Sequence, residues 1–112
     1  MNVILRRTYG LLDDSVEPAT ALLKAMANKH RLLVLTKLAD REYSVGELET
    51  ITGLGQSALS QHLARLRRDR LVATRKSAQT VYYRLADHKV RRVLETLDHL
   101  YEAEFEAAFS QE

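Results

Sequence analysis

Residues 55–70 read GQSALSQHLARLRRDR and have the period of an amphipathic helix. At about 100° per residue, Leu63 and Leu66 fall within about 40° of Leu59, so the three leucines form one buried stripe. The other side has no acid before Asp69, although a solvated helix face more often mixes Glu with Lys. That side carries Ser57, Ser60, Gln61, Ala64, Arg65 and Arg68. Ser, Gln and Arg side chains read base edges and hold phosphates, so we interpret this segment as a recognition helix for DNA.

The segment after this helix predicts a β-hairpin and then a long helix. Residues 71–75 and 80–85 are rich in β-branched and aromatic side chains, and residues 76–79 between them form a short basic tip. Side chains alternate between the faces of a strand, so we expect one of Tyr82 and Tyr83 in the core. Asp87 can cap the last helix, whose apolar residues recur every three or four positions.

Three helices are expected before the recognition helix. The first carries Pro18 in its first turn and continues to about residue 28, and the second ends near residue 40. The third is short, with Ser44 and Glu47 spaced as a capping box and Gly53 at its end. This order predicts a mainly α fold with a small β-hairpin, a winged helix-turn-helix of the order α-α-α-α-β-β-α. We divide the chain into an N-terminal arm (1–16), a DNA-binding and dimerisation domain (17–109) and a tail (110–112).

The charge is unevenly distributed along the 112 residues, although the net charge is only +2. Residues 56–84 contain seven basic residues and one acid, whereas residues 93–112 contain six acids and no Lys or Arg. This pattern indicates one surface that faces a polyanion and another that faces away from it.

Composition excludes several classes of protein. There is no cysteine, hence no disulfide, thiolate metal site or thiol switch. No apolar run approaches the roughly 18 residues of a membrane span, and the first ten residues lack the features of a signal peptide, so we expect a cytoplasmic protein. No nucleophile–base pair, glycine-rich phosphate loop or carboxylate pair is apparent, so we expect no enzyme activity and no cofactor.

Five separated motifs resemble the ArsR/SmtB family of bacterial winged-helix repressors, in the branch that contains HlyU, NolR and BigR. They are SVGEL (44–48), QSALSQHL (56–63), LRRD (66–69), LV (71–72) and QTVYY (79–83). The resemblance extends from about residue 19 to residue 101. It implies a homodimeric repressor that binds an imperfect palindrome in double-stranded DNA near a promoter.

The DNA contacts are assigned by position on the recognition helix and hairpin. We expect base-edge and nearby phosphate contacts from Gln56, Ser57, Ser60 and Gln61, and backbone contacts from Arg65 and Arg68. The tip of the hairpin would reach the flanking minor groove through Arg75, Lys76 and Gln79. His62 is at the edge of the core face, where packing or a phosphate contact is favoured over base reading. His30, with Lys29 and Arg31, is either a phosphate contact or a solvated charge cluster.

The first and last helices carry more apolar surface than one small domain needs, which favours a symmetric dimer. The expected interface residues are Leu22, Val90, Val93, Leu94, Leu97, Leu100 and Tyr101.

The chain departs from the family pattern in two ways. Gly55 replaces the usual serine before the recognition helix, which still allows an N-cap. Some relatives sense sulfur species or oxidants with two cysteines, and Thr36 and Glu102 take their places here, so the thiol switch is not carried over.

Two alternatives to a repressor without a thiol switch stay open. One is a metal-responsive repressor that binds zinc between the last helices, with His88, His99 and Glu102 as weak candidate ligands. In this chain Ala86 replaces the family's aspartate ligand, and the adjacent Asp87 faces about 100° away on a helix. The other is a protein-interaction module acting through the acidic last helix. An inducer or protein partner is not identified by the sequence.

Overall fold

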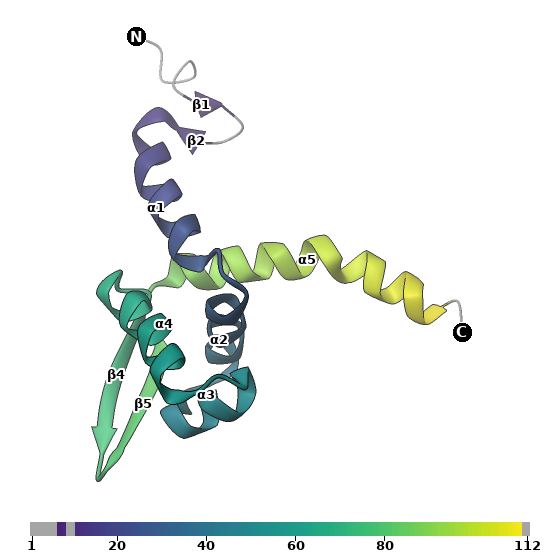
Figure 1. Cartoon of the computed structure of the whole chain (residues 1–112). Helices are drawn as coiled ribbons and strands as arrows, with labels where there is room; N and C mark the ends of the chain where they lie inside the picture. The colour runs from purple at the N-terminus through teal and green to yellow at the C-terminus, as the bar shows by residue number, and fades with distance from the viewer. Residues whose placement is uncertain (1–6, 9–10, 111–112) are drawn as a thin grey trace.

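The computed structural model describes residues 7–8 and 11–110, and Figure 1 shows their arrangement. The helices are α1 (Val16–Met26), α2 (Lys29–Asp40), α3 (Val45–Thr52), α4 (Gln56–Arg68) and α5 (His88–Ser110), with a 3₁₀ turn at Asp13–Ser15. The strands are β1 (Arg7–Thr8), β2 (Leu11–Leu12), β3 (Tyr43–Ser44), β4 (Val72–Ser77) and β5 (Thr80–Leu85). The fold is mainly helical, as predicted.

The core surrounds α2, which packs against α1, α3, α4, α5 and β5. Leucine and valine side chains with less than 2% exposure come from α2, α3, α4 and α5: Val34, Leu35, Leu48, Leu59, Leu66 and Val90. Leu63 of α4 is also buried, so the predicted leucine stripe on this helix is confirmed.

Local signals determine where α3 begins and ends and where α4 begins. The Ser44 hydroxyl accepts a hydrogen bond from the Glu47 backbone N–H, and the Glu47 carboxylate accepts one from the Ser44 N–H, which confirms the expected capping box. Gly53 ends α3 with φ of +69°, a left-handed conformation that glycine adopts without a steric cost. Gly55, two residues after Gly53, is the N-cap of α4, which begins at Gln56.

The wing is a three-stranded antiparallel sheet in the order β3-β5-β4. The hairpin was predicted, whereas β3 was not, because a two-residue strand leaves no period in the sequence. The predicted tip at residues 76–79 was too long. Lys76 and Ser77 belong to β4, and only Ala78 and Gln79 form the turn.

Part of the predicted N-terminal arm forms regular secondary structure. β1 and β2 pair antiparallel, with Arg7 opposite Leu12, and the 3₁₀ turn then leads directly into α1. The rest of the predicted arm lies outside the described residues, as do residues 111–112 of the predicted tail.

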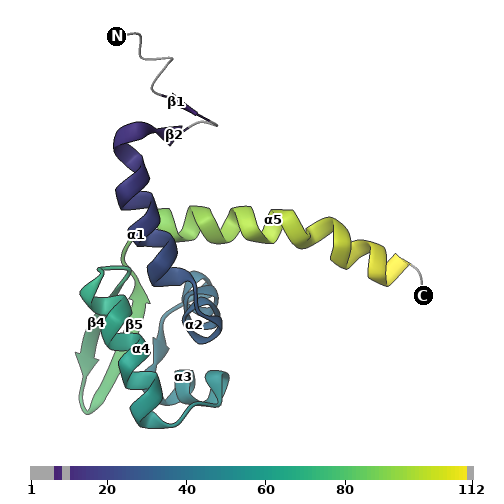
Figure 2. The ribbon, with the colours of Figure 1, turned by 45° about the horizontal axis from the view of Figure 1, so that its top comes forward.

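α1 and α5 extend away from the core in different directions (Figures 1 and 2). The first part of α5 packs on the domain, with Val90 at 0% exposure, whereas Leu100, Tyr101 and Phe105 are 61–66% exposed. Val90 therefore belongs to the protomer core. The sequence predicted it in the dimer interface, but its side chain is not available to a partner. No helix in the described part of the chain is long and apolar enough to cross a membrane.

Candidate nucleic-acid interface

The exposed face of α4 carries the polar side chains that the sequence assigned to DNA. The exposed members of the predicted set are Gln56, Ser57, Ser60, Gln61, Arg68, Arg75, Lys76 and Gln79, whereas His62 and Arg65 are partly buried. The face is available because Leu59, Leu63 and Leu66 direct the other side of the helix into the core. Gly55 precedes the helix in an extended conformation and provides no side-chain cap.

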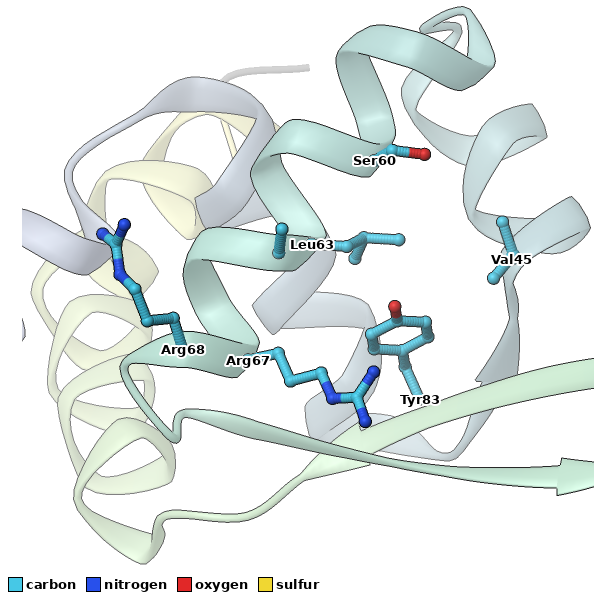
Figure 3. A pocket seen from close by; sticks show the side chains of 7 residues that line it. Val45, Ser60, Leu63, Arg67, Arg68 and Tyr83 are labelled. Atoms are coloured by element: carbon cyan, nitrogen blue, oxygen red, sulfur yellow. The ribbon is translucent and has the colours of Figure 1, made fainter.

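A hollow of about 500 Å³ separates α4 from the start of α3 and from the wing. It is lined by Val45, Ser60, Leu63, Ala64, Arg67, Arg68 and Tyr83. Figure 3 shows Arg67 extending beside the Tyr83 ring, whereas Arg68 leaves the helix on the other side. Our sequence assignment omitted Arg67, although its position, about 80° from Leu59, turns it toward the wing. The hollow therefore has the exposed residue Arg67 beside Tyr83 and Ser60 elsewhere in its lining, between the helix and the wing.

The two arginines assigned to the DNA backbone share one acid at the end of α4. Nε of Arg65 lies 3.7 Å from Oδ2 of Asp69, and Nε of Arg68 lies 3.6 Å from Oδ1. The Arg68 side chain is 72% exposed, whereas that of Arg65 is 39% exposed. Arg68 can thus reach a phosphate without leaving a buried site.

Arg75 is held by a carboxylate that our sequence analysis did not identify. Its Nη2 donates to Oε1 of Glu42 at 2.6 Å and its Nε to Oε2 at 2.9 Å, while its guanidinium carbon lies 4.4 Å from the centre of the Tyr82 ring. This hydrogen-bonded pair lowers the pKa of Glu42 and raises that of Arg75. No sequence signal could reveal it, because the two residues are 33 positions apart.

Arg75 and Lys76, which are neighbours on β4, point to opposite faces of the sheet. Arg75 pairs with Tyr82 and Thr74 with Tyr83, and paired residues share a face while successive residues alternate. Tyr83 lines the hollow with Leu63, so Arg75 is on the face turned away from α4. Lys76 lies on the same face as Tyr83 and is exposed. Lys76 is therefore better placed than Arg75 for a phosphate beside the recognition helix.

A buried arginine connects α1 to the recognition helix. Arg31, at 7% exposure, donates from Nε to the Ala25 carbonyl at 2.6 Å and from Nη2 to the Lys24 carbonyl at 3.1 Å. Its Nη1 lies 3.5 Å from Nδ1 of His62. The expectation of a solvated charge cluster is therefore wrong for Arg31. In the sequence, Arg31 is part of a run of basic residues at the start of a helix. Such a run does not show which of its side chains are solvated and which are buried.

His62 packs in the surroundings that Arg31 creates. Burial, then the Arg31 charge and then His30 lower the pKa of His62, and the rings of His30 and His62 are 5.8 Å apart. Neutral His62 can accept from Arg31, whereas protonated His62 would repel it. The structure thus agrees with packing, one of the two roles expected for this histidine.

The weak metal candidates do not converge within one chain. His99 lies 3.5 Å from Glu102, but His88 is eleven positions earlier on the same helix, about 16 Å along its axis. In residues 7–8 and 11–110, no three His, Asp or Glu side chains come together as a metal site would require.

Comparison with known proteins identifies the family. The family described as "Bacterial regulatory protein, arsR family" matches residues 28–74. Transcriptional activator HlyU of Vibrio cholerae serotype O1 is 59% identical over 90 residues, which cover 80% of this chain and 83% of HlyU. This chain belongs to the arsR family. Nodulation protein NolR of Rhizobium meliloti is 47% identical over 88 residues, covering 79% of this chain and 72% of NolR.

Solved structures of arsR-family proteins have the same winged helix-turn-helix fold. HlyU from Vibrio cholerae superimposes with a TM-score of 0.76 at 54% identity, over 80% of this arsR-family chain and 98% of that one. The homodimeric winged helix-turn-helix DNA-binding domain of Mb0332 from Mycobacterium bovis gives a TM-score of 0.69 at 28% identity, over 89% and 95% of the two chains. The predicted family, branch and fold are confirmed.

Proposed function

We propose that this chain is a sequence-specific transcriptional regulator, a homodimeric repressor that binds an imperfect palindrome. The observation that carries the proposal is the exposed face of α4, which has no acid between Gln56 and Arg68 and lies beside a wing bearing Lys76. Two such helices can enter successive major grooves when two protomers are related by two-fold symmetry. The function is one of binding, with no catalytic step, and it acts on DNA in the cytoplasm.

The dimer is supported by apolar side chains that the single chain leaves exposed. Leu23 of α1 is 55% exposed and Leu100 and Tyr101 of α5 are 62% and 61% exposed, on two helices that extend from the core. Four other predicted interface residues, Leu22, Val93, Leu94 and Leu97, are partly buried, and the first three of them pack against the protomer core. The similarity to a homodimeric domain of the same fold points in the same direction.

The test is binding of labelled promoter fragments from upstream of the chain's own gene, titrated with salt. Lys76→Gln should weaken binding to all sequences equally and reduce the slope of log K against log salt by about 0.9, because one phosphate contact is lost. Arg75→Gln should reduce the slope less, since Glu42 already neutralises that guanidinium. Equal slopes for wild type and Lys76→Gln would remove the wing from the interface.

A second variant tests base reading by α4. Gln61→Ala should relax the preference at particular base pairs, with a loss of about 1–3 kcal/mol of discrimination, while the salt slope stays unchanged. The measurement is competition between the operator and single-base-pair variants. If affinity and preference were both unchanged, the assignment of this helix face would be refuted.

Repression should be insensitive to thiol chemistry. Thr36 and Glu102 stand where the resemblance places the sensing cysteines of some relatives, and the chain has no cysteine. A hydroxyl and a carboxylate do not undergo thiol–disulfide exchange. Operator affinity measured with reductant, tetrasulfide or mild oxidant should therefore be the same. A rapid loss of binding on adding persulfide, reversed by reductant, would contradict this prediction.

A further inference from the structure

A second pocket lies between α1, the end of α4 and the start of α5, and it shares Arg68 with the hollow beside the wing. Its volume of about 730 Å³ is within the range of small-molecule sites, roughly 300–1,000 Å³. Pro18, Ala19 and Leu22 of α1 provide an apolar wall, and Leu71 contributes from the segment after α4.

Basic side chains surround this apolar wall and exceed the acids. The charged residues that line the pocket are Lys24, Arg65, Arg68, Lys89, Asp69 and Asp87. Asp69 is shared between two arginines at 3.6 and 3.7 Å, longer than the roughly 2.7–2.9 Å of a charge-assisted hydrogen bond. Asp87 lies 3.8 Å from Nζ of Lys89. The acids of the pocket therefore leave a net positive charge around it.

One donor in the wall lacks an acceptor. Nε of Arg65 is buried, and no acceptor lies within hydrogen-bonding distance of it in the described part of the chain. This atom is closed to solvent and lies 3.7 Å from Oδ2 of Asp69, so a ligand would approach the rest of the Arg65 side chain, which is 39% exposed. The charge of Arg65 also acts on Arg31, since burial and then Arg65 lower the pKa of Arg31. Arg31 in turn binds the carbonyl of Lys24, in the wall of the pocket.

We propose that this pocket binds a small amphipathic anion, with its apolar body against α1 and its acidic group beside Arg65 and Lys89. The anion would neutralise the excess charge and offer acceptors to Arg65, which a cation or a neutral apolar molecule of the same shape could not do. The consequence for DNA rests on the proposed function. Arg65 and Arg68 line the pocket and are also our candidates for phosphate contacts, so ligand and operator should weaken each other's binding.

The binding test uses the full-length chain and decanoate as the probe, followed by calorimetry and backbone amide NMR without DNA. We expect one site per chain, with shifted amides at Leu22, Arg65 and Leu71. Decyltrimethylammonium, which has the same alkyl chain and the opposite charge, should not bind at equal concentration. Ala19→Phe should fill the pocket and abolish decanoate binding. Lys89→Gln should weaken it about two- to five-fold, whereas the exposed control Lys37→Gln should leave it unchanged.

Three outcomes would overturn the proposal. Decanoate does not bind, because a second copy of the chain or nothing at all occupies the pocket. The other two are equal binding of decanoate and decyltrimethylammonium, and amide shifts confined to residues 100–105. Operator binding is measured separately with and without decanoate, and we expect decanoate to weaken it in the wild type but not in Ala19→Phe. If decanoate binds as expected but no DNA does, the proposed function fails and the pocket stands. If DNA binds but decanoate does not, the proposed function stands and the proposed ligand pocket fails.

Discussion

Arg31→Ala should lower the free energy of unfolding by about 2–4 kcal/mol, a large effect for a residue in a basic run. The last carbonyls of a helix have no partner within the helix, and Arg31 donates to two of those at the end of α1, Lys24 and Ala25. Each buried carbonyl left without a donor costs about 1–3 kcal/mol. Removing a buried charge also returns its desolvation cost, so the total should be less than the sum.

Urea unfolding at a fixed protein concentration measures this effect. Lys29→Ala, two positions earlier and exposed, is the matched control and should stay within about 0.5 kcal/mol of the wild type. Arg31→Lys should fall between the two, because one ammonium cannot occupy the positions of both Nε and Nη2. A stability of Arg31→Ala equal to that of the control would show that α1 is held by its apolar contacts alone.

The pH dependence gives an independent readout of the same contact. Burial and Arg31 lower the pKa of His62 in the folded chain, so the unfolded chain binds more protons in this range. The contribution of His62 to stability is therefore complete above its ordinary pKa of about 6.5 and is lost as the pH falls. In folded Arg31→Ala the pKa of His62, followed by NMR, should move up toward the ordinary value.

Local patterns predicted the elements that position the interface. The leucine stripe of α4 and the capping box at Ser44 each involve residues within one or two helical turns, so their physical cause is visible in the sequence. Alternation along β5 likewise predicted that one tyrosine would be in the core, and Tyr83 is buried. The contact residues on α4 and the wing remain predictions.

The contacts that could not be predicted join residues distant in the sequence. Arg75 and Glu42 meet only because β3 pairs with β5, which brings the segment before β3 across the sheet. The assignment of Arg75 to DNA considered its charge but not a partner 33 positions away. Val90 was placed at the dimer surface because its helical period is the same as that of Leu97. A period shows which face is apolar but not which part of that face the protomer itself covers.

Leu100→Glu should abolish the dimer and weaken operator binding by about 10²–10³-fold. Leu100 is 62% exposed in the single chain, so the new charge should not disturb the protomer core. In the proposed dimer the same side chain enters an apolar contact, where an unpaired carboxylate is strongly unfavourable. Two half-sites bound by one linked dimer gain about 10²–10⁴-fold over one half-site, and that gain is lost when the protomers separate.

His99→Glu is the matched control, because it adds a negative charge at an exposed position of α5 that lies about 160° from Leu97, away from the apolar stripe. Sedimentation equilibrium should give a monomer for Leu100→Glu and a dimer for His99→Glu, with unchanged helix content in both. Binding of Leu100→Glu to a single half-site should equal that of the wild-type protomer, because the face of α4 is intact. A Leu100→Glu protein that remains a tight dimer would place the end of α5 outside the interface, and the exposed side chains of Leu100, Tyr101 and Phe105 would then need another partner.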